Sequence, residues 1–308
     1  MNTVTLEHIS KSYNKGKTLA VRDVSFSVNH GELFGLIGPD GAGKTSIFRI
    51  LTTLLLPDEG TATVAGYDVV KQYHEIRGAV GYMPGRFSLY QDLSVEENLD
   101  FFATLFETTI EKNYEMIRDI YVQLEPFKDR RAGKLSGGMK QKLALCCALI
   151  HKPSVLFLDE PTTGVDAVSR KEFWDMLKRL KKQDITILVS TPYMDEAELC
   201  DRIALIQDGK ILSINTPEGT VRSFKGSLFA VRADAMVKLL NDVRDNPRVH
   251  NCFVFGEFFH LSFKDNSLSN ESDLIAYLTS KGHRNIELHP VQPSIEDCFI
   301  DFLKQEHA

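Results

Sequence analysis

An eight-residue stretch near the start of the chain constrains the fold more than any other feature. It reads Gly38-Pro-Asp-Gly-Ala-Gly-Lys-Thr45 and fits the pattern G-x-x-x-x-G-K-[ST], whose glycines let backbone N–H groups curl around phosphate oxygens. The apolar run Leu33 to Gly38 precedes it, and Ser46 to Leu51 has the pattern of a helix start. A phosphate-binding loop requires this strand–loop–helix context, which predicts an α/β fold with a largely parallel sheet.

The residues of this loop predict an ATP site. Lys44 is expected to reach the β- and γ-phosphates, and the Thr45 hydroxyl is expected to hold Mg²⁺. Asp40 is unusual here, and its carboxylate is expected to point outward, away from the phosphates. The loop residues assigned to ATP are Gly38, Asp40, Gly41, Ala42, Gly43, Lys44, Thr45 and Ser46.

A second acidic motif supplies the catalytic half of this site. The apolar strand Val155 to Asp159 ends in a carboxylate that is expected to reach the Mg²⁺ shell. Glu160 follows and is placed to accept a proton from an attacking water, as a general base must. The sequence therefore predicts ATP hydrolysis with Glu160 as the catalytic residue.

Charge and cysteine content exclude several classes of protein. The 36 basic and 42 acidic side chains give a net charge of −6, which argues against nucleic acid as a partner. The five cysteines are an odd number and form no Cys-x-x-Cys pair, so a zinc site or disulfide framework is not expected. This cysteine content fits a reducing compartment.

No membrane span or secretion signal is expected. The longest apolar run, Leu143 to Ile150, is far shorter than the roughly 20 residues that a spanning helix needs. Met1 to Ser10 lacks the apolar core of a secretion signal.

The pattern along the chain predicts two domains. Residues 1–218 alternate apolar strands and amphipathic helices, with a mainly helical part at about 73–151. Residues 226–308 carry the order β-α-β-β-α-β, which predicts a small α+β module of the ferredoxin-like kind. Further strands are predicted at Ile185 to Ser190 and Ile203 to Gln207, a helix at Ser169 to Lys182, and a capping box at Ser94 and Glu97.

The stretch Leu135-Ser-Gly-Gly-Met-Lys-Gln141 resembles the signature motif of ATP-binding-cassette (ABC) ATPases. The resemblance covers about residues 3 to 215. It implies that two cassettes sandwich two ATP molecules, so that Ser136, Gly137, Gly138 and Gln141 face the ATP of the partner cassette. It also implies that Tyr13 stacks on adenine and that the loop ending at Asp166 crosses the dimer interface.

Two further stretches resemble the ATPase subunits of ABC-2-type exporters. They are Met83-Pro-Gly-Arg-Phe-Ser-Leu-Tyr90 and Tyr193-Met-Asp-Glu-Ala197, and the C-terminal module adds to the likeness. In such exporters, a group that includes drug and antibiotic exporters, the cassettes are separate chains beneath integral-membrane subunits. The resemblance therefore implies a cytoplasmic, peripheral protein on the cytoplasmic face of the cell membrane, with a homodimeric or heterodimeric cassette pair.

Two positions depart from the family pattern. Gly85 stands where the family has a Gln that contacts Mg²⁺ and the water, and Pro192 stands where it has a His that contacts the γ-phosphate. Glycine offers no ligand, and proline has neither a side-chain donor nor a backbone N–H. Since losing one transition-state donor typically costs ~10²–10³ in rate, slow hydrolysis is expected.

Three interpretations remain open. The chain is an ATP-hydrolysing exporter subunit, or a weakly catalytic cassette that lends its signature to a competent partner, or a cassette that acts outside transport. A single signature and the absence of a long coiled coil between Lys44 and Ser136 argue against the third.

Overall fold

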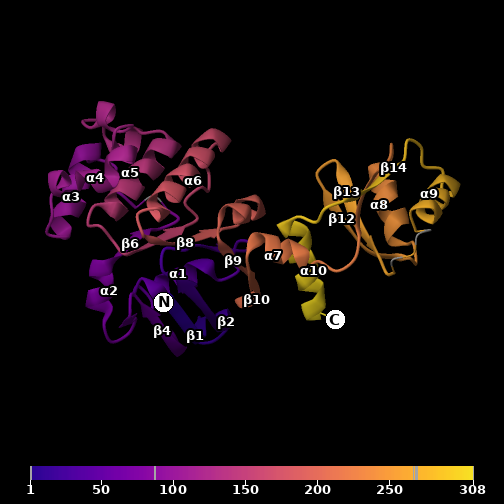
Figure 1. Cartoon of the computed structure of the whole chain (residues 1–308), viewed down its shortest axis with the longest axis horizontal. Helices are drawn as coiled ribbons and strands as arrows, with labels where there is room; N and C mark the ends of the chain where they lie inside the picture. The colour runs from indigo at the N-terminus through magenta and orange to yellow at the C-terminus, as the bar shows by residue number, and fades with distance from the viewer. Residues whose placement is uncertain (1, 87, 266, 268–269, 308) are drawn as a thin grey trace. The chain divides into compact units, whose positions relative to one another are not determined.

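The computed structural model describes residues 2–86, 88–265, 267 and 270–307, and it divides the chain into two compact units (Figure 1). The first unit runs to Glu218 and includes the chain again from Phe302, while the second runs from Gly219 to Asp301. The sequence pattern had assigned the whole chain end to the second domain. The boundary between Asp301 and Phe302 lies inside one continuous helix, α10 (Ile295–His307). The sequence there is that of a helix and not of a linker, so it gives no sign of the boundary.

A central sheet of six strands organises the first unit. It contains β3 (Leu33–Ile37), β6 (Val80–Met83), β7 (Val155–Asp159), β8 (Thr186–Thr191), β9 (Arg202–Gln207) and β10 (Lys210–Asn215). The order is β10-β9-β3-β8-β7-β6, with β9 to β6 parallel and β10 antiparallel at the edge. β3, β7 and β8 are buried along their whole length, as is usual for parallel strands covered on both faces. This sheet confirms the predicted α/β class.

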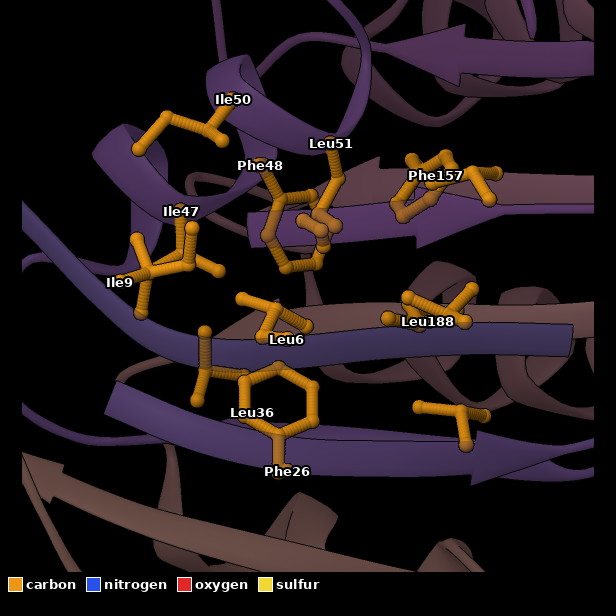
Figure 2. Close-up of a cluster of buried hydrophobic side chains, with 14 of the residues drawn as sticks. Leu6, Ile9, Phe26, Leu36, Ile47, Phe48, Ile50, Leu51, Phe157 and Leu188 are labelled. Carbon is orange, nitrogen blue, oxygen red and sulfur yellow. The ribbon is translucent and has the colours of Figure 1, made fainter. Parts of the chain in front are cut away.

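A separate antiparallel sheet lies beside the central one. It contains β1 (Asn2–Tyr13), β2 (Thr18–Asn29), β4 (Glu59–Val64) and β5 (Tyr67–Asp68), in the order β2-β1-β4-β5. The helix α1 (Lys44–Leu51) packs into the apolar core that the two sheets share. Figure 2 shows Phe48 and Leu51 of α1 among Leu6 of β1, Phe157 of β7 and Leu188 of β8. The helix that carries the phosphate-binding loop is therefore anchored on both sides.

Further helices form a group at one side of the central sheet (Figure 1). They are α3 (Val95–Leu105), α4 (Ile110–Tyr121), α5 (Gly137–Leu149) and α6 (Ala167–Lys181), and the short α2 (Tyr73–Ala79) precedes them. Ser94 and Glu97 form the predicted capping box at the start of α3. The range 73–151, predicted to be mainly helical, begins with α2 but also contains β6, which joins the central sheet. Four residues of mixed polarity gave no periodic signal for that strand.

The second unit has the predicted ferredoxin-like arrangement. Its elements are β11 (Leu228–Arg232), α8 (Met236–Arg244), β12 (Val249–Phe255), β13 (Phe258–Phe263), α9 (Asn270–Ser280) and β14 (Glu287–Val291), with α7 (Pro217–Arg222) before them. The antiparallel sheet has the order β12-β13-β11-β14. Leu239, Leu274 and Leu278 of the two helices pack on Val231 and Leu261 of the sheet.

No helix in the described part of the chain combines the length and the apolar character that crossing a lipid bilayer requires.

Candidate nucleotide-binding site

The phosphate-binding loop joins the buried end of β3 to the first turn of α1. Close packing dictates glycine at two of its positions. A Cβ on Gly38 would lie 2.1 Å from the Ile206 carbonyl oxygen, and Gly43 has φ 104° with its missing Cβ 2.3 Å from the Ala20 carbonyl oxygen. The backbone can therefore follow this tight curve only without side chains at these two points.

Lys44 lies inside the curve of the loop. Its Nζ donates hydrogen bonds to the carbonyl oxygens of Gly38, at 2.8 Å, and Pro39, at 3.0 Å. The same Nζ is 3.1 Å from Oε1 of Glu160, and Lys44 is only 3% exposed. The structure thus brings the predicted phosphate-binding cation and the predicted general base into direct contact.

Asp159 and Glu160 are both held by one serine of the neighbouring strand. The Ser190 hydroxyl, at the end of β8, donates to Oδ1 of Asp159 at 2.6 Å and accepts from the Glu160 N–H at 3.0 Å. Glu160 has φ 50°, a left-handed conformation that is uncommon outside glycine and that accumulates at functional sites. Ser190 therefore orients the carboxylate that ends β7 and fixes the backbone turn that follows it.

The acidic end of β7 suits a hard cation. Asp159 is buried and its Oδ1 accepts the Ser190 hydroxyl, and carboxylate and hydroxyl oxygens such as those of Asp159 and Thr45 are ligands of the kind Mg²⁺ prefers. Burial, reinforced by the negative charge of Asp159, raises the pKa of Tyr82 to about 12. The Tyr82 phenol is therefore uncharged at neutral pH.

The remaining loop and ring positions are placed as follows. The Tyr13 hydroxyl is 3.1 Å from Oγ of Ser46, so the predicted adenine-stacking ring lies beside the first turn of α1. Asp40 is exposed, which leaves its carboxylate free to face solvent. Ala42 is buried, and its carbonyl accepts the Gly209 N–H at 3.0 Å.

The signature segment begins a helix. Ser136 caps α5 by accepting the Met139 N–H at 3.3 Å, and Gly137 and Gly138 form the first turn. The sequence indicates a helical run from Lys140 to Ile150, and the structure begins this helix three residues earlier, at Gly137. Gly138 is required by packing: its missing Cβ would lie 2.7 Å from the Ser169 hydroxyl of α6. Gln141, on the next turn, is half-buried.

Asp166 caps the neighbouring helix. Its Oδ1 accepts the N–H groups of Val168 and Ser169 at the start of α6, at 3.1 and 3.0 Å. Hydrogen bonds from the Ser169 backbone and side chain hold the pKa of this exposed carboxyl below its usual range. The predicted interface loop therefore ends in a charged helix cap next to the signature.

The two altered positions follow the ends of two central strands, Gly85 after β6 and Pro192 after β8. Gly85 lies against the end of β7, where a Cβ would be 3.0 Å from the Asp159 carbonyl oxygen and 3.7 Å from Cβ of Glu160. Pro192 directly follows Thr191 at the end of β8. Phe87, in the same exporter-like stretch as Gly85, lies outside the described residues.

An apolar groove of about 600 Å³ opens near Gly85. Residues of β6, α3 and α5 line it, among them Met83, Phe102, Leu105 and Ala144, with His151 at the end of α5. The Phe106 ring stacks on the His151 ring, with centroids 3.7 Å apart. Leu54 and Leu105 on its wall are more than half exposed.

Sequence reasoning missed two residues that the structure brings into the site. Ser190 was predicted only as part of a buried strand, and Glu196 only as part of the exporter-like stretch Tyr193 to Ala197. The signal for Ser190 was a polar residue at the end of the strand that was predicted to follow the Asp159 strand. Glu196 gave no comparable signal, because its partner Thr162 lies 34 residues away and its other partner, Thr191, directly follows a predicted buried strand.

Comparison with known proteins decides the family. The family described as "ABC transporter" matches residues 21–163. Nod factor export ATP-binding protein I of Rhizobium sp. (strain N33) is 34% identical over 98% of this chain and 97% of its own length. The chain belongs to the ABC transporter family. CbiO1 of Clostridium perfringens, described as part of the ABC transporter complex cbiONQ, shares the cassette fold, with a TM-score of 0.64 at 23% identity over 72% of this chain and 91% of its own.

This ABC cassette also matches a longer relative. The probable multidrug ABC transporter ATP-binding protein YbhF of Escherichia coli (strain K12) is 38% identical over 97% of this chain and 52% of its own length. The chain thus spans about half the length of that curated relative. The first unit carries the ABC cassette fold.

Proposed function

We propose that this ABC cassette binds and hydrolyses ATP as the nucleotide-binding subunit of an exporter. ATP-driven pairing of two cassettes would power integral-membrane subunits. The observation that carries the proposal is the convergence of Lys44, Asp159 and Glu160 at the carboxyl ends of β3 and β7. Names of relatives, such as multidrug transporter and Nod factor export proteins, support export as the direction.

Within this site each residue has a separate task. The backbone N–H groups of Gly41 and Gly43 would face the phosphates, and Lys44 supplies the cation. Thr45 and Asp159 would hold Mg²⁺, which neutralises phosphate charge when it is bound. Glu160 accepts the proton of the attacking water.

The apolar groove near Gly85 supports a membrane partner. Its exposed Leu54 and Leu105 suit the apolar face of a short helix from an integral-membrane subunit. Docking there would place the cassette on the cytoplasmic face of the cell membrane. The groove adjoins the segment that ends at Gly85, beside Asp159, and so connects the partner to the nucleotide site.

A second candidate function has an observation of its own. The signature Ser136–Gly138 is complete, whereas Gly85 and Pro192 remove two groups that would serve this chain's own nucleotide. The cassette would then bind ATP mainly to pair with a different, competent cassette and complete that partner's site.

Equilibrium binding of a fluorescent ATP analogue, followed by phosphate release, tests the proposal. Wild-type protein should bind Mg·ATP, and Lys44→Ala should weaken binding at least tenfold, because the buried cation is lost. Lys112→Ala, an exposed lysine of α4, is the matched control and should bind normally. Equal affinity of wild type and Lys44→Ala would refute the assigned phosphate site.

A further inference from the structure

A buried carboxylate outside the catalytic set joins three parts of the cassette. Glu196, in the 3₁₀ helix Met194–Leu199, is 2% exposed. Its Oε1 accepts the Thr162 hydroxyl at 2.8 Å, and its Oε2 accepts the Thr191 hydroxyl at 2.5 Å. Nε of Arg170, on α6, is 3.7 Å from Oε1.

The partners of Glu196 all belong to segments of the nucleotide site. Thr162 lies two residues after Glu160 and opens the loop that ends at Asp166. Thr191 ends β8, and its carbonyl oxygen accepts the Gly38 N–H of the phosphate-binding loop at 3.2 Å. Arg170 lies one turn into the helix that Asp166 caps, so the carboxylate is a common anchor for all three segments.

Stability alone does not account for a carboxylate at this place. Burying a charge is costly, and well-packed apolar residues of similar volume often stabilise a protein equally well or better. A carboxylate offers two acceptor oxygens in fixed directions, one for the Thr162 hydroxyl and one for the Thr191 hydroxyl, and an apolar side chain offers none. By binding both hydroxyls, the Glu196 carboxylate fixes the distance and the orientation of Thr162 relative to Thr191.

We propose that Glu196 is a positioning residue that holds the Thr162–Asp166 loop in register with the phosphate-binding loop. The inference rests on the proposed ATPase function and adds a residue to it. When two cassettes close on ATP, the Thr162–Asp166 loop must meet the partner while the phosphate-binding loop, tied to Thr191 through the Gly38 N–H, holds the phosphates. Glu196 keeps these two parts of one chain at a constant separation, so that cassette pairing and nucleotide geometry stay coupled.

An amide at this position would break the arrangement without changing its size. In Glu196→Gln one acceptor oxygen becomes an N–H donor, which faces a threonine hydroxyl that also needs an acceptor. If that N–H faced Thr191, Oγ1 would have to accept it in addition to the Tyr193 N–H at 3.1 Å, and the Thr191 hydroxyl proton would lose its Glu196 acceptor. We expect turnover in the assembled transporter to fall about 10–100-fold, the usual cost when a partner that orients a functional group is lost. ATP affinity should stay within about twofold, since Lys44 and its loop remain.

Matched variants separate positioning from folding. Thr162→Val keeps the shape of the side chain and removes its hydroxyl, so it should reproduce the loss of turnover. Thr162→Ser keeps the hydroxyl and should remain near wild type. Glu198→Gln alters an exposed carboxylate of the same 3₁₀ helix and should be neutral.

The measurements are the dissociation constant of an ATP analogue and the turnover number of the assembled complex, with thermal unfolding of each variant alongside. Glu196→Gln with turnover within twofold of wild type would overturn the inference and leave the proposed function intact. Parallel losses of ATP binding, thermal stability and turnover, with no rescue in Thr162→Ser, would also overturn it by showing a general folding role. A wild-type protein that binds no ATP would overturn the proposed function and this inference with it.

Discussion

The ammonium nitrogen of Lys44 lies 3.1 Å from a carboxylate oxygen of Glu160. The two residues come from different motifs, 116 positions apart by their numbers, and their opposite charges attract each other. An incoming γ-phosphate competes with Glu160 for the same cation. ATP binding is therefore expected to exchange one anion for another at Lys44 and to free the carboxylate for proton transfer.

Glu160→Gln should bind ATP several-fold more tightly than wild type while losing turnover. The amide no longer competes for Lys44 and no longer repels the phosphates, but it cannot accept the proton of water. Titration with a fluorescent ATP analogue, paired with phosphate release, measures both effects. Asp175→Asn, at an exposed position of α6, is the charge-matched control. Weaker ATP binding in Glu160→Gln would show that the ion pair assists nucleotide entry.

Restoring the two altered family positions should raise the ATPase rate. We expect Gly85→Gln combined with Pro192→His to increase turnover by up to ~10²-fold, because both add groups near the γ-phosphate. Gly85→Ala is the steric control, since its Cβ meets the Asp159 carbonyl oxygen at the same 3.0 Å but brings no amide. Fast wild-type turnover, unchanged in the double variant, would mean that these groups are dispensable here.

Signature and base variants distinguish symmetric from asymmetric pairing. Ser136→Arg puts a long cation at the start of α5, and it should stop an assembled complex in either case. Glu160→Gln should be much milder if the partner is a different, competent cassette, because this chain's own site, with Gly85 and Pro192, is expected to be slow. In a homodimer both variants affect every site. Comparable losses in transport and ATPase assays would thus reject the asymmetric arrangement.

Gly138→Ala should destabilise the cassette, whereas Gly137→Ala should not. The Cβ at 138 would lie 2.7 Å from the hydroxyl oxygen and 3.0 Å from Cβ of Ser169, while the one at 137 has its nearest neighbour at 3.9 Å. We expect a loss of about 1–3 kcal/mol for Gly138→Ala from overpacking, and no loss or a gain of up to about 1 kcal/mol for Gly137→Ala from helix propensity. Urea unfolding measures both. Adding Ser169→Ala, which removes the nearest atom, should recover part of the loss.

The free energy of unfolding should decrease at acidic pH, partly because His151 becomes protonated. Burial lowers the pKa of this imidazole below its ordinary value of 6.5, although a hydrogen bond to the Val80 carbonyl partly opposes the shift. The unfolded chain therefore binds the proton more readily, and stability falls as the pH drops below that ordinary value. His151→Phe should lose less stability than wild type between about pH 7.5 and about pH 5 in urea titrations. An identical pH dependence in the two proteins would exclude this contribution.

Local sequence patterns and motifs were sufficient to predict the fold class and several individual elements. The strand before Lys44, the strand ending at Asp159 and the capping box at Ser94 each depend on residues within one short window. Periodicity and capping rules describe such windows well. The β-α-β-β-α-β order of the second unit was readable for the same reason.

What stayed hidden depends on contacts between distant segments. The Lys44–Glu160 pair and the hydrogen bond from Thr162 to Glu196 require the order of the strands in the sheet. The early start of α5 follows from a tertiary cause as well, since contact with Ser169 overrides the poor helix propensity of Gly138. The short strand β6 went unseen because pairing with β7, rather than its own composition, makes it a strand.

The position of β6 has a mechanical consequence. β6 is the edge strand of the central sheet, and its neighbour β7 is where the chain returns after α3, α4 and α5. The segment that contains α3, α4 and α5 is therefore connected in sequence to the central sheet at two adjacent strands, β6 and β7. A tilt of this segment would leave the pairing of β3, β8 and β9 intact. Gly85 follows the end of β6 and lies against the Asp159 carbonyl oxygen, so such a movement would reach the backbone between Asp159 and Glu160.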